Sequence, residues 1–125
     1  MQQTRLDPAA IEVLRGRLTA ELSEATAAID SSKGALSSFL TSRRGVEVDD
    51  EHDPEGSTLA LHFSETTALL NNSRRHLDQT VAALGKIADG SYGTCDRCQR
   101  DIPLARLEAR PAATHCVSCA TAVGA

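Results

Sequence analysis

The chain has 125 residues, the size of one domain, and its two Phe, one Tyr and no Trp exclude a large aromatic core. Its apolar residues are mainly Ala, Leu, Val and Ile, a composition that favours helices packed side by side over a sandwich or barrel. The net charge of −4 argues against a protein that wraps bare DNA, since nonspecific DNA affinity comes mainly from clustered Lys and Arg. We therefore expect an all-α fold and a protein partner.

The N-terminal segment and the cysteines indicate the compartment. No apolar run follows a basic start in the first ten residues, and nowhere do about eighteen apolar residues follow one another. We therefore expect a cytoplasmic protein with neither a signal peptide nor a membrane span. In that reducing compartment, four cysteines in two close pairs fit metal ligands better than disulfides.

A first long helix is predicted between Asp7 and Gly45. Asp7 can cap the first turn and Pro8 fits the first helical position, while Gly45 can take the left-handed conformation that ends a helix. Two rows of mostly apolar residues recur every seven positions between these ends, which predicts a coiled-coil seam. The first row is Ile11, Leu18, Ala25, Ser32 and Phe39, and the second is Leu14, Leu22, Ile29 and Leu36.

A second helix is predicted between Asp53-Pro54 and Gly90, with the same start and stop residues. Its seam consists of Phe63, Leu70, Leu77 and Leu84, flanked by Leu59, Thr66, Val81 and Ile87. The two helices would have about 36 residues each and a length of roughly 54 Å, and a loop of about ten residues would join them. Equal lengths and a short connection predict an antiparallel hairpin. We assign residues 1–90 to this hairpin, with a tip loop at about 44–56, and expect a monomer. The alternative is two arms of an intermolecular coiled coil.

The cysteines form two C-x-x-C pairs, Cys95 with Cys98 and Cys116 with Cys119, separated by seventeen residues. Each pair forms a tight turn with two thiolates, and two such turns complete a tetrahedral four-sulfur shell around one structural zinc ion. We assign residues 91–125 to this small four-cysteine zinc finger, which ends in a very short tail. The alternatives are a rubredoxin-like iron site, a redox dithiol pair and a disulfide framework. His115 adjoins the second pair and is expected to be an exposed neighbour.

The charge of the cysteine segment bears on its partner. GATA-type DNA-binding fingers use the same cysteine spacing, but a DNA finger should be more basic than this one. Its arginines are nearly balanced by acids: Arg97, Arg100, Arg106 and Arg110 against Asp96, Asp101 and Glu108. A zinc-stabilised DNA-binding protein and a redox-sensing thiol switch remain the alternatives. No combination of nucleophile, base and oxyanion donor is recognisable, so an enzyme is not expected.

The residues within and between the cysteine pairs carry a family resemblance. The run from Tyr92 to Cys98, then Ile102, then Arg106 to Pro111 and Cys116 closely resembles the C4 zinc finger of the DksA/TraR family. This resemblance implies a bacterial regulator that binds RNA polymerase directly and does not contact promoter DNA by itself. Ile102 and Leu107 are expected to be apolar anchors of the finger.

The resemblance also implies roles for two charged sets of residues. In the family, a helical hairpin enters the secondary channel of RNA polymerase and places acidic tip residues near the catalytic magnesium. The acids at this chain's tip are Asp49, Asp50, Glu51, Asp53 and Glu55. The family pattern of two aspartates followed by an alanine is only partly kept in any alignment of them. Arg106 and Arg110 face the polymerase in this interpretation, or form ion pairs within the finger.

Overall fold

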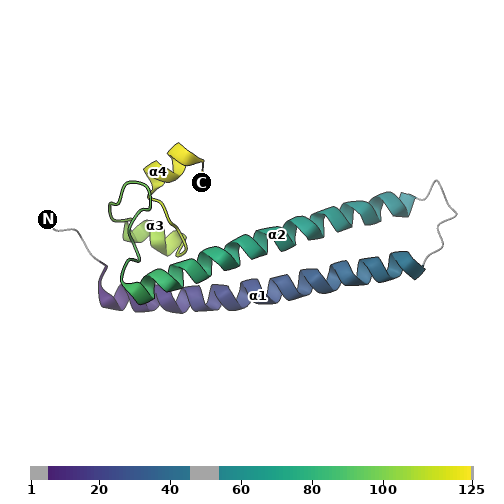
Figure 1. Ribbon diagram of the computed structural model, residues 1–125, viewed down its shortest axis with the longest axis horizontal. Helices are drawn as coiled ribbons and strands as arrows, with labels where there is room; N and C mark the ends of the chain where they lie inside the picture. Colours follow the sequence, from purple (N-terminus) through teal and green to yellow (C-terminus); the bar gives the residue numbers. More distant parts are fainter. Residues whose placement is uncertain (1–5, 46–53, 125) are drawn as a thin grey trace. The chain divides into compact units, whose positions relative to one another are not determined.

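The computed structural model describes residues 6–45 and 54–124, and these contain four helices (Figure 1). The two long helices are α1 (Pro8–Gly45) and α2 (Pro54–Asp89), and the two short ones are α3 (Leu104–Ala109) and α4 (Val117–Val123). In the part of the chain that is described, the only β pairing is an isolated bridge, Thr94 with Asp101. The predicted all-α fold, two long antiparallel helices followed by a four-cysteine segment, is confirmed.

The ends of the long helices follow the predicted capping residues. Asp7 lies at the start of α1, where its carbonyl accepts a hydrogen bond from Ile11 N–H at 3.0 Å. At the end of α2, Gly90 has a φ of +83°, a left-handed conformation that glycine adopts at little cost. Gly90 N–H then donates to Ile87 O and Ser91 N–H to Lys86 O. These two bonds form a Schellman motif, which satisfies carbonyls that the helix end leaves free.

The chain divides into two compact units, and each long helix runs through both. The unit Glu24–His76 contains the later part of α1 and the earlier part of α2. Ala25, Ile29 and Leu70 are its buried seam residues. The Phe39 and Phe63 rings also meet across the seam, with centroids 4.9 Å apart and planes tilted by 45°. The predicted seam positions therefore face one another here.

Two seam predictions in α2 are wrong. Leu59 is 48% exposed, because pairing Phe39 with Phe63 leaves Leu59 beyond the last apolar seam residue of α1. Val81 is 53% exposed, while the neighbouring Thr80 is fully buried. One residue turns the side-chain direction by about 100° in a helix, so only one of these two side chains can point into the interior. The register that buries Thr80 exposes the more apolar side chain.

The second unit joins residues Met1–Ser23 to Leu77–Ala125. A buried hydrophobic cluster in this unit consists of Leu14, Cys95, Ile102, Leu107 and Cys119. The predicted apolar anchors Ile102 and Leu107 are confirmed, with exposures of 3% and 0%. Leu14 was expected to serve the helical seam, and it packs instead among residues of the four-cysteine segment. The first turns of α1 thus supply part of that segment's core.

The C-terminal residues form more structure than a short tail. α4 begins directly after Cys116, and Gly124 ends it with a φ of +74°. Cys119 and Ala120 are its buried residues. We call residues 91–124, which include α3 and α4, the finger.

Candidate metal centre

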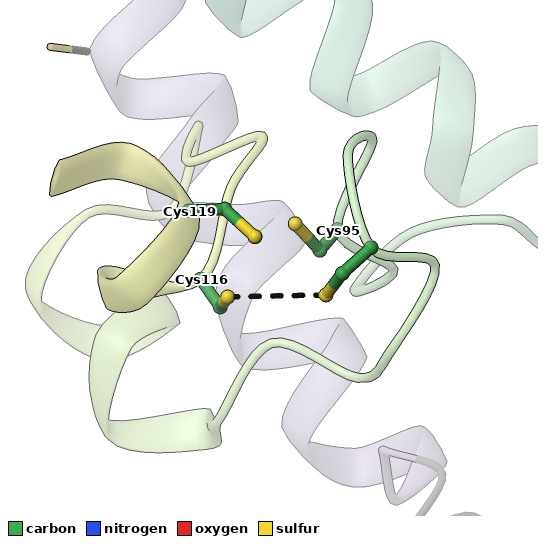
Figure 2. A group of neighbouring side chains, drawn as sticks. Cys95, Cys116 and Cys119 are labelled. Carbon is green, nitrogen blue, oxygen red and sulfur yellow. Dashed lines mark hydrogen bonds between the residues drawn. The ribbon is translucent and has the colours of Figure 1, made fainter. Parts of the chain in front are cut away.

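The four cysteine sulfurs gather in one place in the finger (Figure 2). Their Sγ atoms lie within 4.8 Å of one another, and those of Cys98 and Cys116 are 4.0 Å apart. A tetrahedral zinc ion with Zn–S distances of about 2.3 Å needs sulfurs about 3.8 Å apart. The structure therefore brings the four predicted ligands together as a set suited to one zinc ion. Among the described residues, no other group of three or more His, Cys, Asp or Glu is close enough to hold a metal.

Backbone hydrogen bonds shape the first cysteine turn. Cys95 N–H donates to Arg100 O at 2.8 Å, and Gln99 N–H donates to Cys95 O at 2.9 Å. Gln99 has a φ of +63°, a left-handed conformation that costs a non-glycine residue about 1 kcal/mol. The Thr94–Asp101 bridge closes the turn behind it. Local pairing thus points Cys95 inward, where it is completely buried.

The second cysteine turn is the start of a helix. Cys116 is the N-cap of α4, and its carbonyl accepts a hydrogen bond from Ala120 N–H at 2.8 Å. The three-residue spacing places Cys119 on the same side of this first turn. Asp96 N–H donates to Thr114 O at 2.9 Å and so ties the two cysteine segments to each other. Helix α4 was not predicted, although a C-x-x-C pair that opens a helix fits its sequence.

The environment of the sulfurs shifts two thiol pKa values in opposite directions. Burial raises the pKa of Cys95, but backbone hydrogen bonds from Cys98, Cys116 and Arg97 and the Cys98 side chain outweigh it and lower the pKa to about 6. The Cys116 side chain and burial raise the pKa of Cys119 to about 11, although the Arg97 guanidinium acts in the lowering direction. Donors already directed at the buried Cys95 sulfur favour its thiolate, the form that binds metal.

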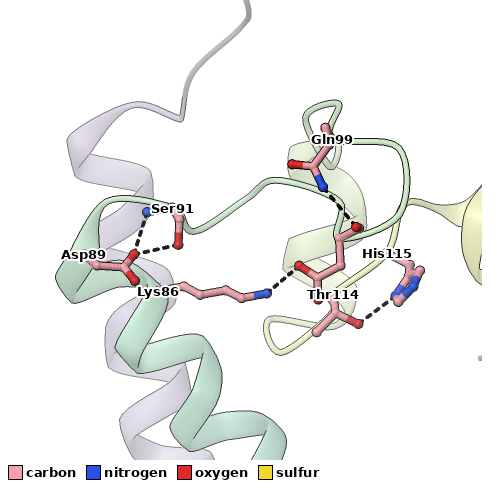
Figure 3. A network of polar contacts seen from close by, with 7 residues as sticks. Lys86, Asp89, Ser91, Gln99, Thr114 and His115 are labelled. Carbon is pink, nitrogen blue, oxygen red and sulfur yellow. Dashed lines mark hydrogen bonds and ion pairs between the residues drawn. The ribbon is translucent and has the colours of Figure 1, made fainter.

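Polar contacts tie the end of α2 to the first cysteine turn (Figure 3). Lys86 Nζ is 2.9 Å from Asp96 Oδ1, and the Gln99 side-chain amide donates to Asp96 O at 3.0 Å. Beside them, Ser91 donates to Asp89 Oδ1 from its hydroxyl at 2.6 Å and its N–H at 2.9 Å. These bonds lower the pKa of Asp89. The cysteine turn is thus fastened directly to the last turn of the long helix.

The two arginines expected on the finger surface lie close together in the structure. Arg106 is half-buried, and its Nε donates to His115 O at 3.4 Å, whereas Arg110 is exposed. His115 is half-buried, with Nδ1 2.7 Å from Thr114 Oγ1, so the expected exposure of this histidine is not found. Both arginines and His115 line a cavity of about 130 Å³. Neither arginine is ion-paired with Glu108 in the described part of the finger.

The acidic tip cannot be placed in the same way. Asp49, Asp50, Glu51 and Asp53 lie outside the described residues, and Glu55 belongs to α2.

Among the described helices, none is long and apolar enough to cross a membrane.

Two residues that were not predicted to belong to the site contact the cysteine turns. Arg97 Nη1 lies 3.8 Å from Cys119 Sγ, and Lys86 forms the ion pair described above. Arg97 lies between the first two cysteines. Its position inside a C-x-x-C pair is the sequence feature that could have predicted a contact with a cysteine sulfur. Nothing in the sequence near Lys86 indicated its partner, because the pair joins a helix end to a loop.

Comparison with known proteins agrees with this geometry. Residues 90–123 match the family model described as the prokaryotic DksA/TraR C4-type zinc finger. The chain is 34% identical over 76 residues to the RNA polymerase-binding transcription factor DksA of Haemophilus influenzae, covering 60% of this chain and 52% of that protein. It is 45% identical over 47 residues to the protein of the same name from Caulobacter vibrioides, covering 38% of this chain and 33% of that one. The matched regions thus span about half or less of these relatives.

The fold extends the likeness beyond the finger. The solved structure of transcription factor DksA2 from Pseudomonas aeruginosa superposes with a TM-score of 0.74, covering 94% of this chain and 85% of that one, at 24% identity. At this identity, the superposition supports a common fold that includes both long helices. Together with the finger match and the four clustered cysteines, it shows a finger similar to the DksA/TraR C4-type zinc finger in a chain that has the DksA2 fold.

Proposed function

We propose that this protein is a transcription regulator that binds RNA polymerase directly and acts without enzymatic chemistry. The observation that carries the proposal is the joint presence of a DksA/TraR finger at residues 90–123 and the two long helices of the DksA2 fold. Relatives from two organisms are named as RNA polymerase-binding transcription factors. Binding to RNA polymerase also implies a cytoplasmic location.

In this proposal Cys95, Cys98, Cys116 and Cys119 bind one structural zinc ion. Four thiolates leave no coordination position for water, so the ion supplies folding energy and no chemistry. The sulfurs lie in the same buried cluster as Leu14 of α1. Zinc then stabilises the finger together with the first turns of the hairpin, which gives a binding surface a defined geometry.

The finer mechanism proposed is insertion of the hairpin into the secondary channel of RNA polymerase. The sequence has the acids Asp49, Asp50, Glu51 and Asp53 between α1 and α2, and Glu55 at the start of α2. α1 has 38 residues and α2 has 36, so each is about 55 Å long at 1.5 Å per residue. Helices of this length suit a protein that reaches into a channel, with acids acting near the catalytic magnesium.

Docking and action should then depend on different residues. Arg106 and Arg110, beside the finger cavity, are proposed to contact the polymerase, and the tip carboxylates to affect catalysis or promoter opening. A charge pair at intermediate dielectric is worth about 4 kcal/mol at 4 Å before desolvation, so deleting tip charges should matter where they act.

The test measures polymerase affinity and promoter-complex lifetime for matched variants. Asp50→Asn with Asp53→Asn should reduce the effect on lifetime, while affinity changes by less than about tenfold. Arg106→Ala with Arg110→Ala should weaken binding, and Arg100→Ala is the control for loss of a finger charge. Glu24→Gln with Asp30→Asn, two exposed acids of α1, controls for loss of helix charge.

Each outcome bears on a separate part of the proposal. Full effect on lifetime from the double Asn variant would exclude the tip mechanism and leave polymerase binding intact. No retention on core polymerase, together with tight binding to duplex DNA at physiological salt, would replace the proposal with a zinc-stabilised DNA-binding protein. Sedimentation of the free protein would check the expected monomer.

A further inference from the structure

Arg97 belongs to the first cysteine turn and reaches a sulfur of the second. Its Nη1 atom lies 3.8 Å from Cys119 Sγ, a contact between residues 22 positions apart. The Arg97 side chain is exposed, whereas Cys119 is only 6% exposed. A charged side chain that reaches solvent therefore contacts the sulfur of a buried cysteine.

The sulfurs need such a cation because of where they lie. Cys95 and Cys119 share a buried cluster with Leu14, Ile102 and Leu107. A zinc ion bound by four thiolates keeps a net negative charge, and placing that charge among leucine and isoleucine side chains is costly without compensation. Hydrogen bonds and cations around the ligands supply the compensation in metal centres.

The other nearby charges do not supply it. Asp96 stands next to Cys95 and would oppose a thiolate, but Lys86 pairs with its carboxylate at 2.9 Å. The Lys86 charge is thereby directed to Asp96 and not to a sulfur. Among the charged side chains that the structure describes, the Arg97 guanidinium is the one hydrogen-bonded to a cysteine sulfur. Arg100 and Arg110 are exposed and make no such contact.

We propose that Arg97 is a positioning residue for the zinc centre, which retains the metal by offsetting thiolate charge and by linking the two cysteine turns through Cys119. This inference rests on the proposed zinc ligands. It adds a fifth residue to the centre, one that binds no metal itself. Removing its charge should weaken zinc retention without removing a ligand.

The test uses the full chain, first unmodified, with zinc content and sulfur coordination established by metal analysis and X-ray absorption. Failure at this step would overturn the zinc ligands themselves and so is separate from failure of the Arg97 role. Zinc affinity is then measured by competition with a chromophoric chelator for Arg97→Gln, Arg97→Lys and the control Arg100→Gln. Circular dichroism verifies that each variant keeps its helices, and the sulfur-to-cobalt charge-transfer band is recorded after Co²⁺ substitution.

Arg97→Gln should lower zinc affinity roughly tenfold. This is the low end of the losses seen when a partner of a metal ligand is removed, because the Arg97 side chain is exposed. Arg97→Lys should recover part of the loss, and Arg100→Gln should match the unmodified protein. The cobalt band should shift in Arg97→Gln, since the charge beside a ligating sulfur has changed. Equal zinc affinity for Arg97→Gln and Arg100→Gln would overturn the proposal. So would an Arg97→Lys variant as weak as Arg97→Gln, because the charge would then have no part in retention.

Discussion

At the scale of single residues, the chain's one tyrosine reports on the finger core. Tyr92 is half-buried, packs against the cluster around Leu14, and donates from its hydroxyl to Pro111 O at 2.7 Å. Burial raises the pKa of Tyr92 from 10.0 to about 12, with Arg17 lowering it and Glu21 raising it by smaller amounts. The folded protein thus favours the neutral phenol.

The predicted consequence is an alkaline loss of stability. Because the folded pKa lies above the unfolded one, the contribution of Tyr92 is fully present below pH 10 and is lost as the pH rises through 12. The ultraviolet absorbance of the phenolate should titrate near pH 12 in the folded protein and near pH 10 in denaturant. Tyr92→Phe is the control, and its stability should depend less on pH in this window. A folded titration near pH 10 would show that the ring is accessible to water.

A second prediction concerns the buried hydroxyl of Thr80. The side chain is fully buried, and its Oγ1 has no hydrogen-bond partner. Thr80→Val keeps the shape and removes the uncompensated polar group, so it should raise the free energy of unfolding by about 1–2 kcal/mol. Thr67→Val is the control, because the Thr67 hydroxyl donates to Phe63 O at 2.8 Å. If urea denaturation shows both substitutions to be equally neutral or harmful, the Thr80 hydroxyl is not a source of instability.

At the scale of elements, α3 is too short to be stable alone. It has six residues, and isolated helices of that length do not form in water. Leu107 is the buried residue of α3. The Arg17 guanidinium of α1 donates a hydrogen bond to the carbonyl of Glu108, near the C-terminus of α3. A carbonyl in the last turn of a helix has no partner within the helix, so Arg17 acts as a cap provided by another element.

The prediction is that Arg17→Gln loosens α3 selectively. Loss of the charged donor should cost about 0.5–1.5 kcal/mol. Amide hydrogen exchange should accelerate at Arg110, whose N–H donates to Arg106 O at 2.8 Å. Arg15→Gln is the control, since Arg15 forms an exposed pair with Glu12 on the same helix. Unchanged exchange at Arg110 would mean that Leu107 alone holds α3 in place.

At the scale of the whole molecule, the units predict how the protein responds to loss of metal. Cys116→Ser should unfold the finger and loosen the helix ends of its unit, because Leu14 would lose the cluster into which it packs. The unit Glu24–His76 has its own seam, including the Phe39–Phe63 contact, and should keep most of its helix. Hydrogen exchange by segment, with circular dichroism, measures both. Loss of nearly all helix would show that the two units fold as one.

Much of this architecture could be predicted from the sequence, because its determinants are local. Seven-residue spacing defines a helix face without knowledge of its partner, and Asp7-Pro8 and Gly90 mark helix ends through their own backbone preferences. The C-x-x-C pairs place two thiolates within one turn, so the spacing alone is enough to recognise the four-cysteine set.

The tertiary structure decided what depends on contacts between distant segments. Tertiary packing buried Thr80 and exposed Val81, although hydrophobicity favours the reverse choice. Leu14 entered the finger core because the first turns of α1 lie against it, and no spacing rule links residue 14 to residue 107. The contact of Arg97 with Cys119 joins residues 22 positions apart, so it depends on how the two cysteine turns pack together. Periodicity and capping act within a few residues of sequence, whereas burial and charge compensation depend on which segments become neighbours in space.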